Sequence, residues 1–449
     1  MAITTHRLDS ADGPPPDPAG RGAEMTVTKR SDLVLAAASV LYVNGQTTDQ
    51  MLGGAERIAR SLRLRTTLVP RWGELQLQVE DADARLVSVA PAEPSGVHMS
   101  RAACMAQTIE DLNAGRLAPA GAMKKIGAIS HAPPLPTWLF ALAAAAGALS
   151  LGMIFGLRHA SAAALILVSA GAGGFLRRLL AKFSTNLFVQ PFAAALLAGV
   201  IGGLAVQWGL SSPLRLVAIC PCLVLVPGPH LLNGGLDLVQ GRIHLGAARL
   251  VYAGLVLLAI TTGLLLGLAL LGQSLTVNPP GRSVPLSRDM IFAGVVAACY
   301  GIYFSMPLRM LAWPVAVGML AHALRWVALT QLGSSPAIAV LVASIFAGLV
   351  ITPVARRRHL PFAGIGFASV VSMLPGSYIT RMAAGLVNIA DGSHTTLALI
   401  SGTIADGTTA MLVILAMGVG LIAPKILIDR FGKKPGRADG KPAALSLYG

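Results

Sequence analysis

Long apolar runs fill the chain from about Leu135 to Pro424, separated by short polar stretches. Each run is near the roughly 20 residues that a helix needs to cross a bilayer. We expect ten spans, at about 136–156, 160–176, 188–208, 214–232, 245–271, 290–305, 308–331, 336–354, 359–376 and 394–423. The stretch 378–393 is too polar to span, and it is interpreted as re-entrant or interfacial. The pattern predicts an α-helical polytopic membrane protein with halves at 136–271 and 290–423 and a polar linker at 272–289.

The stretch 25–130 has the pattern of a small soluble domain. Apolar residues recur at helical spacing, whereas Leu75–Val79 alternates like a half-buried strand. We expect helices at 31–43, 50–64, 99–114 and 118–129, and strands at 75–79 and 85–90. Residues 1–24 are polar and rich in proline and glycine, which predicts a disordered tail. Residues 424–449 form a basic tail. The soluble stretch is therefore predicted to be an N-terminal α/β domain.

The two halves share an order of landmarks. Spans 3 and 8 begin near Pro191 and Pro336, each after a helix that ends in a Leu-Arg pair. Spans 4 and 9 each end in an apolar-Pro-Gly sequence. The alternative is that helices rich in Ala and Leu always look alike. A true repeat would contain five spans. Because five is an odd number, the second copy would enter the membrane from the opposite side. That gives two inverted five-helix repeats, an architecture common among secondary transporters.

The Pro-Gly sequences predict breaks in spans 4 and 9, because proline removes a backbone donor and glycine tolerates unusual dihedrals. A helix broken at membrane depth is tolerated where protein or a water-filled cavity satisfies the backbone. Half-helix ends attract opposite charges, which suits a zwitterionic ligand. The candidate substrate-binding residues are Pro227, Gly228, His230, Asn233, Pro375, Gly376, Ser377, Tyr378 and Thr408.

Two acidic residues are candidates for proton coupling, because an ionisable group inside a span is costly and marks function by default. Asp406 lies among hydroxyl residues in the last span, and Asp237 follows the first break. Two structural alternatives stay open. Asp406-Gly407 can form an exposed turn between two helices, and Asn233 with Asp237 can cap an interfacial turn.

Composition narrows the function classes. The net charge of +15 comes mainly from residues at helix ends and in the C-terminal tail, without a base-reading motif, so we expect a bilayer and no nucleic acid as partner. The side with more Arg and Lys places both termini in the cytoplasm. The four cysteines, including Cys220 and Cys222, lack metal-ligand spacing, so no metal, cofactor or catalytic set is expected.

The chain resembles the threonine/serine exporter family of bacterial inner-membrane proteins. The resemblance covers about Ser31 to Asp429 and rests on three segments: Asn44-Gly45 with Thr47 and the Ala55–Leu62 helix, Pro227–Gly241, and Leu374–Tyr378. It implies efflux of threonine and serine by a secondary-active exporter driven by the proton gradient. The sequence departs from many members at Gly45-Gln46-Thr47-Thr48-Asp49, where acidic residues near the turn are common. The resemblance therefore does not carry a ligand or hydrolytic role over to the N-terminal domain.

Other functions remain open at this stage. The cargo can be another small metabolite, such as a dipeptide or an organic acid. Alternatively, the protein is a membrane-anchored enzyme that uses its N-terminal domain, or a receptor or scaffold. Ten spans are more than an anchor needs, and the domain has no visible nucleophile–base set. Whether the chain forms a homo-oligomer is left open.

Overall fold

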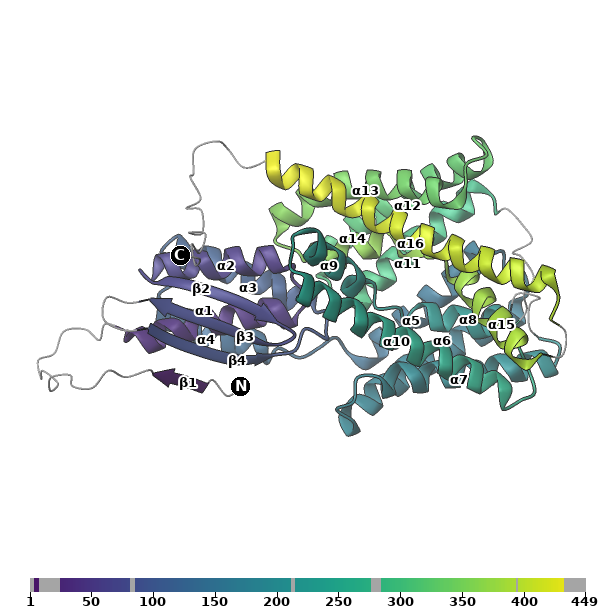
Figure 1. Ribbon diagram of the computed structural model, residues 1–449, viewed down its shortest axis with the longest axis horizontal. Helices are drawn as coiled ribbons and strands as arrows, with labels where there is room; N and C mark the ends of the chain where they lie inside the picture. Colours follow the sequence, from purple (N-terminus) through teal and green to yellow (C-terminus); the bar gives the residue numbers. More distant parts are fainter. Residues whose placement is uncertain are drawn as a thin grey trace, which may run out of the picture.

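The computed structural model describes residues 4–7, 25–80, 85–210, 215–275, 284–392 and 395–431. The molecule is elongated, with the N-terminal region at one end and a bundle of long helices over the rest (Figure 1). Most of the predicted tails at 1–24 and 424–449, and residues 276–283 of the linker 272–289, lie outside the described residues.

The N-terminal region is an antiparallel sheet in the order β1-β4-β3-β2, with helices against it. Alternate side chains of β3, namely Leu75, Leu77 and Val79, are buried beneath α1, as the period-two pattern predicts. The elements are β1 (Thr4–Arg7), α1 (Val27–Val43), α2 (Thr48–Ser61), β2 (Arg65–Arg71), β3 (Gly73–Glu80), β4 (Arg85–Ala92), α3 (Met99–Asn113) and α4 (Pro119–Ser130).

Two strands were not predicted. β2 is an edge strand in which exposed and half-buried residues alternate, and it contains Pro70, so its composition is that of a loop. β1 lies within the stretch that was expected to be a disordered tail, and it pairs with β4. Backbone hydrogen bonds along a sheet edge require no apolar side chains. Composition therefore gave no signal for either strand.

Twelve α-helices and two short 3₁₀ turns make up the part from residue 137 onward that the structure describes. Eight of the helical segments in the described residues are long and apolar enough to cross a membrane, and two bent pairs raise the total to ten if each pair is one span. The chain is a polytopic helical membrane protein. The helices are α5 (Thr137–Ile154), α6 (Ala160–Phe183), α7 (Val189–Gln207), α8 (Leu216–Leu223), α9 (Gly228–Val239), α10 (Ile243–Ala269), α11 (Leu286–Tyr303), α12 (Ala312–Thr330, after a short 3₁₀ turn η1, Leu308–Met310), α13 (Pro336–Arg358), α14 (Phe362–Val370, continued by the 3₁₀ turn η2, Val371–Met373), α15 (Gly376–Asp391) and α16 (Leu397–Phe431).

Helices pair in the same order in the two halves. In the first half α5 packs on α6, α6 on α7, and α7 on α10; in the second, α11 packs on α12, α12 on α13, and α13 on α16. The bent pair contacts the last helix of its half in both cases, as α9 with α10 and α15 with α16. Helices α5 and α11 contact each other and join the halves.

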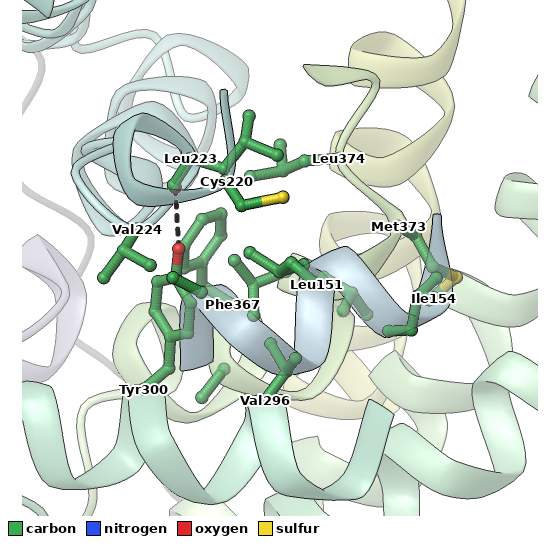
Figure 2. Packing of buried hydrophobic residues seen from close by; sticks show 14 of the residues in the cluster. Leu151, Ile154, Cys220, Leu223, Val224, Val296, Tyr300, Phe367, Met373 and Leu374 are labelled. Atoms are coloured by element: carbon green, nitrogen blue, oxygen red, sulfur yellow. Dashed lines mark hydrogen bonds between the residues drawn. The ribbon is translucent and has the colours of Figure 1, made fainter. Parts of the chain in front are cut away.

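The apolar core of the helical part lies around the first segments of the two bent pairs. Side chains of α8, α11 and α14 meet there, among them Leu223, Tyr300 and Phe367 (Figure 2). Cys220 and Cys222 are buried in the same core as free thiols. This packing fixes the two breaks against each other.

Candidate functional site

The two helix breaks have the same backbone geometry. Pro227 has φ −82° and ψ 55°, and Pro375 has φ −79° and ψ 43°. In each case the amide of the following glycine donates to the carbonyl two residues earlier, at 2.9 Å for Gly228 and 2.8 Å for Gly376. These are inverse γ-turns centred on proline. They bend α9 from α8 by 49° and α15 from α14–η2 by 67°.

Each break packs against the other broken helix. A Cβ at Gly228 would lie 1.8 Å from Cε2 of Phe367 in α14, and a Cβ at Gly376 would lie 2.2 Å from Cδ2 of Leu223 in α8. Both distances are far below van der Waals contact. A Cβ at Gly228 would overlap the Phe367 ring, and one at Gly376 would force the Leu223 side chain to move, so Pro-Gly serves both the turn and the crossing of the two helices.

A buried tyrosine satisfies the backbone at the first break. Tyr300 in α11 donates its phenolic hydrogen to the carbonyl of Leu223 at 2.8 Å (Figure 2). The side chain is almost completely buried, and the carbonyl belongs to the last residue of α8. The tyrosine therefore replaces a helical hydrogen bond that is lost where the helix ends.

The polar face of α9 is buried against the N-terminal region. His230, Asn233 and Asp237 are all nearly inaccessible. The Asn233 side chain donates to the carbonyl of Gly45 at 3.3 Å, in the turn between α1 and α2. Asn44-Gly45 and Pro227–Gly241, which both belong to the sequence segments that carry the family resemblance, therefore meet in space.

Ion pairs extend this contact. The Asp237 carboxylate lies 3.0 Å from Arg249 Nε and 3.3 Å from Arg242 Nη1. Arg242 also forms an ion pair with Asp49 at 2.5 Å, and the Gln240 side chain donates a hydrogen bond to the Asp49 carboxylate. Arg249 is fully buried and lies over the ring of Tyr42, 5.2 Å from its centroid. Asp237 is thus a buried, paired carboxylate, and its arginine partners were not predicted.

A cavity of about 500 Å³ lies between the N-terminal region, α6 and the first break. Its polar lining includes Arg177 and Arg178 from α6, His230 from α9, Tyr252 from α10 and Glu93 from the segment after β4. Pro227 and Pro229 form part of the wall, whereas no residue of the second break lines it. The predicted substrate-binding residues come from both breaks; among the described residues only the first break lines this cavity.

Arg177 is the side chain in this cavity that is best suited to an anion. Its Nε and Nη1 atoms are buried and have no hydrogen-bond partner among the described residues. The guanidinium lies 5.4 Å from the centroid of the Tyr303 ring, which holds it without neutralising it. A planar guanidinium with free donors matches a carboxylate. Arg177 was not among the predicted site residues, although its place in the repeated Leu-Arg pair was a usable signal.

The residues of the second break form a separate group. Asp406 accepts from Arg381 at 2.9 and 2.5 Å, and Arg381 lies 4.8 Å from the centroid of the Tyr378 ring. Helix α16 is continuous through Leu397–Phe431, so the alternative of an exposed turn at Asp406-Gly407 is excluded. Ser377 is half-buried at the start of α15. Asp406 is therefore a paired carboxylate within a helix.

Thr408 lies apart from both groups. Its side chain is exposed on α16, and its hydroxyl donates to the carbonyl of Ile404 at 2.8 Å. Of the predicted substrate-binding residues, the structure brings Pro227 and His230 to the cavity and packs Gly228 and Gly376 into the helix crossing. The segment 378–393, interpreted as re-entrant or interfacial, is helical as part of α15 up to Asp391.

His98 at the rim of the cavity gives a prediction of pH dependence. Burial, with Arg101 nearby, lowers the pKa of His98 from 6.5 to about 4, and its Nδ1 accepts from the Arg101 amide at the start of α3. Because the folded state then binds fewer protons than the unfolded state, stability should fall as pH falls from about 6.5 towards 4. Thermal unfolding in detergent should show this slope, and His98→Asn, which keeps a capping side chain, should flatten it. An unchanged slope in the variant would contradict the assignment.

Spanning helices, two matched breaks and a polar cavity at one of them define a membrane protein of the transporter class. A family model described as "Putative threonine/serine exporter" matches residues 32–271, and one described as "Threonine/Serine exporter, ThrE" matches residues 289–427. The chain belongs to the threonine/serine exporter family. This membership supports an amino-acid exporter and confirms the resemblance that the sequence motifs indicated.

The chain is also similar to a single protein along most of its length. The chain is 25% identical over 410 residues to a protein of Mycobacterium tuberculosis named "Probable threonine/serine exporter", an alignment that covers 85% of this chain and 76% of the relative. No solved structure matches the chain.

Proposed function

We propose that the protein is a secondary-active exporter of small neutral amino acids such as threonine and serine, driven by the proton gradient across the bacterial inner membrane. The observation that carries the proposal is the membership of both halves in the exporter family, together with a cavity beside a broken helix. The positive-inside rule supports cytoplasmic termini. In that orientation the cavity faces the cytoplasm, where an exporter loads its substrate.

The two halves are proposed to be inverted repeats. Support comes from the identical order of helix pairing, the same inverse γ-turn at both breaks, and an odd number of spans in each half if each bent pair is one span. Each broken helix contributes one side of the crossing at Gly228 and Gly376. Rocking of one half against the other around this crossing would then alternate access.

Arg177 is proposed to bind the substrate carboxylate. It offers free, buried donors in the cavity. Glu93 lines the same cavity and is the carboxylate available there for the substrate ammonium group. His230 and Tyr252 lie at its wall, with ring centroids 5.0 Å apart, and can hydrogen-bond a side-chain hydroxyl. The same charges would accept a dipeptide, so competition by dipeptides against threonine efflux separates the two cargoes.

Asp237 and Asp406 are proposed as the proton-coupling groups. Each carboxylate pairs with a buried arginine, Arg249 and Arg381 respectively. Protonation of such a carboxylate removes its charge and weakens the pair, which would link proton binding to movement of the helices. The two pairs lie at different breaks, so a proton can act on either side of the crossing.

Asp406→Asn tests this role. The amide cannot take up a proton, so export is expected to be lost while the protein remains in the membrane. Threonine efflux from cells with matched amounts of membrane protein measures the effect. Asp429→Asn is the control on the same helix, because it removes a half-buried carboxylate that also has a basic partner, Lys425, but lies away from both breaks. Normal export by a well-expressed Asp406→Asn protein would remove Asp406 from the mechanism.

A further inference from the structure

A second cluster of charged and polar side chains lies at the other break, at the end of the helical bundle remote from the N-terminal region. Figure 1 places α15 at that end and α9 beside the soluble region. Asp289 of α11 contacts His322 of α12 at 2.9 Å, and Arg381 of α15 pairs with Asp406 of α16. Arg325 of α12 joins the two pairs, because it interacts electrostatically with Asp289 and with Tyr378, the ring that Arg381 covers. Buried charges are costly within a membrane protein and are retained where they serve a pathway. The proposed cytoplasmic cavity does not use this cluster.

The cluster occupies positions that match the cavity when the halves are counted from their Pro-Gly pairs. Arg177 lies fifty residues before Pro227, and Arg325 lies fifty residues before Pro375. Three residues after each proline stand His230 and Tyr378. Arg177 and His230 line the cavity. Their counterparts are the arginine at the end of α12 and the tyrosine at the start of α15.

The next pair of matched positions includes Arg381, which forms the ion pair with Asp406. Six residues after the prolines stand Asn233 and Arg381, both buried. Asn233 contacts the N-terminal region through Gly45, whereas Arg381 pairs with Asp406. The position that ties α9 to the soluble domain in the first half therefore carries an ion pair within the second half.

The two halves differ in what their polar groups contact. On the cavity side, Arg177 Nε and Nη1 have no partner among the described residues. On the other side, the Asp406 carboxylate takes two hydrogen bonds from Arg381, the arrangement that an amino-acid carboxylate makes with arginine. Two buried atoms of this cluster, Arg381 Nη1 and His322 Nε2, still lack a partner in the described chain. The Arg381 side chain is only 8% exposed.

We propose that this cluster is the second half of the substrate pathway, closed in this conformation by the Arg381–Asp406 pair. When the pair separates, Arg381 is free to bind the carboxylate of the departing amino acid, the role proposed for Arg177 on the loading side, although Arg381 does not occupy the position that matches Arg177 in the repeat. The inference rests on the proposed function and on cytoplasmic termini, which put the cluster on the extracytoplasmic side. It makes Asp406 an internal competitor for the substrate-binding arginine.

Thiol accessibility tests the proposal without knowledge of the cargo. In a background where Cys104, Cys220, Cys222 and Cys299 are replaced, Ser377→Cys places a single thiol beside Tyr378 in the cluster. A membrane-impermeant methanethiosulfonate reagent is applied to spheroplasts, and the labelling rate is measured. We expect slow labelling with the pair intact, and labelling about tenfold faster with Asp406→Asn, because a charge-assisted bidentate pair is lost.

The charge-swapped protein Arg381→Asp with Asp406→Arg is the control for folding, because it restores the pair in reverse. It should return labelling of the Ser377→Cys thiol towards the slow rate. Equal labelling rates with and without Asp406→Asn, in proteins present at equal amounts in the membrane, would overturn the proposal. Faster labelling with Asp406→Asn, together with no threonine export by the protein that keeps Asp406, would keep the pathway and reject the cargo. Threonine export by the protein that keeps Asp406, without faster labelling in Asp406→Asn, would reject the gate and keep the cargo.

Discussion

Replacing Gly228 with alanine is expected to leave little folded protein in the membrane. The new Cβ would lie 1.8 Å from the Phe367 ring, and the atoms around it belong to the crossing of two broken helices. Overpacking a well-packed core typically costs about 1–3 kcal/mol, and we expect the upper end or more because the ring is itself buried. The measurement is the amount of monodisperse protein extracted in mild detergent and its thermal midpoint.

The chain offers matched controls for this substitution. Gly254 in α10 and Gly418 in α16 are helical glycines with no atom within 4 Å of an added Cβ, so alanine there should be tolerated. Reducing the ring with Phe367→Leu in the Gly228→Ala background should recover part of the loss. Wild-type yield and midpoint in Gly228→Ala alone would mean that the broken helices do not cross as described.

Loss of Arg177 is the second large effect that we expect. Arg177→Gln removes the buried guanidinium from the cavity, and truncating one partner of a buried charged contact costs about 2–5 kcal/mol. Threonine export at a subsaturating internal concentration should therefore fall by about thirtyfold or more. The measurement is the initial efflux rate at several internal threonine concentrations.

Two variants on α6 separate substrate binding from a general effect of charge. Lys182→Gln removes a positive charge from the exposed end of the same helix and should leave export unchanged. Arg177→Lys keeps the charge but not the planar fork, and should recover only part of the rate. Full export by Arg177→Gln would exclude this arginine as the carboxylate site.

The helical part was predictable because its signals are local. Apolar length gives the spans, and proline followed by glycine marks the breaks at Pro227-Gly228 and Pro375-Gly376. Both prolines adopt the same turn, so each break follows from a two-residue signal. The lengths of the apolar runs also predict the number of spans, which is ten if each bent pair is counted as one span.

The partners of the charged residues were not predictable in the same way. Asp237 meets Arg249 a few turns away in the next helix, and Asp406 meets Arg381 across a loop. The contact from Asn233 to Gly45 joins residues that are 188 positions apart. A single sequence carries no record of such distances, and the polar residues looked like separate caps or turns.

The N-terminal region contributes directly to the cavity wall. Its segment around Glu93–His98 lines the cavity, and the Asn44–Asp49 turn holds α9 through Asn233, Gln240 and Arg242. A sequence view that separates a soluble domain from a transport domain misses this. The N-terminal region and the first break are better regarded as one structural unit.

The most direct test of the central claim is threonine efflux. Cells that lack their own exporters are loaded with a threonine-containing dipeptide, and extracellular threonine is followed with and without a protonophore. Efflux that depends on the protein and collapses with the protonophore is the result we predict. Absence of efflux from a verified, folded protein would contradict the proposed cargo, and efflux that persists with the protonophore would contradict proton coupling.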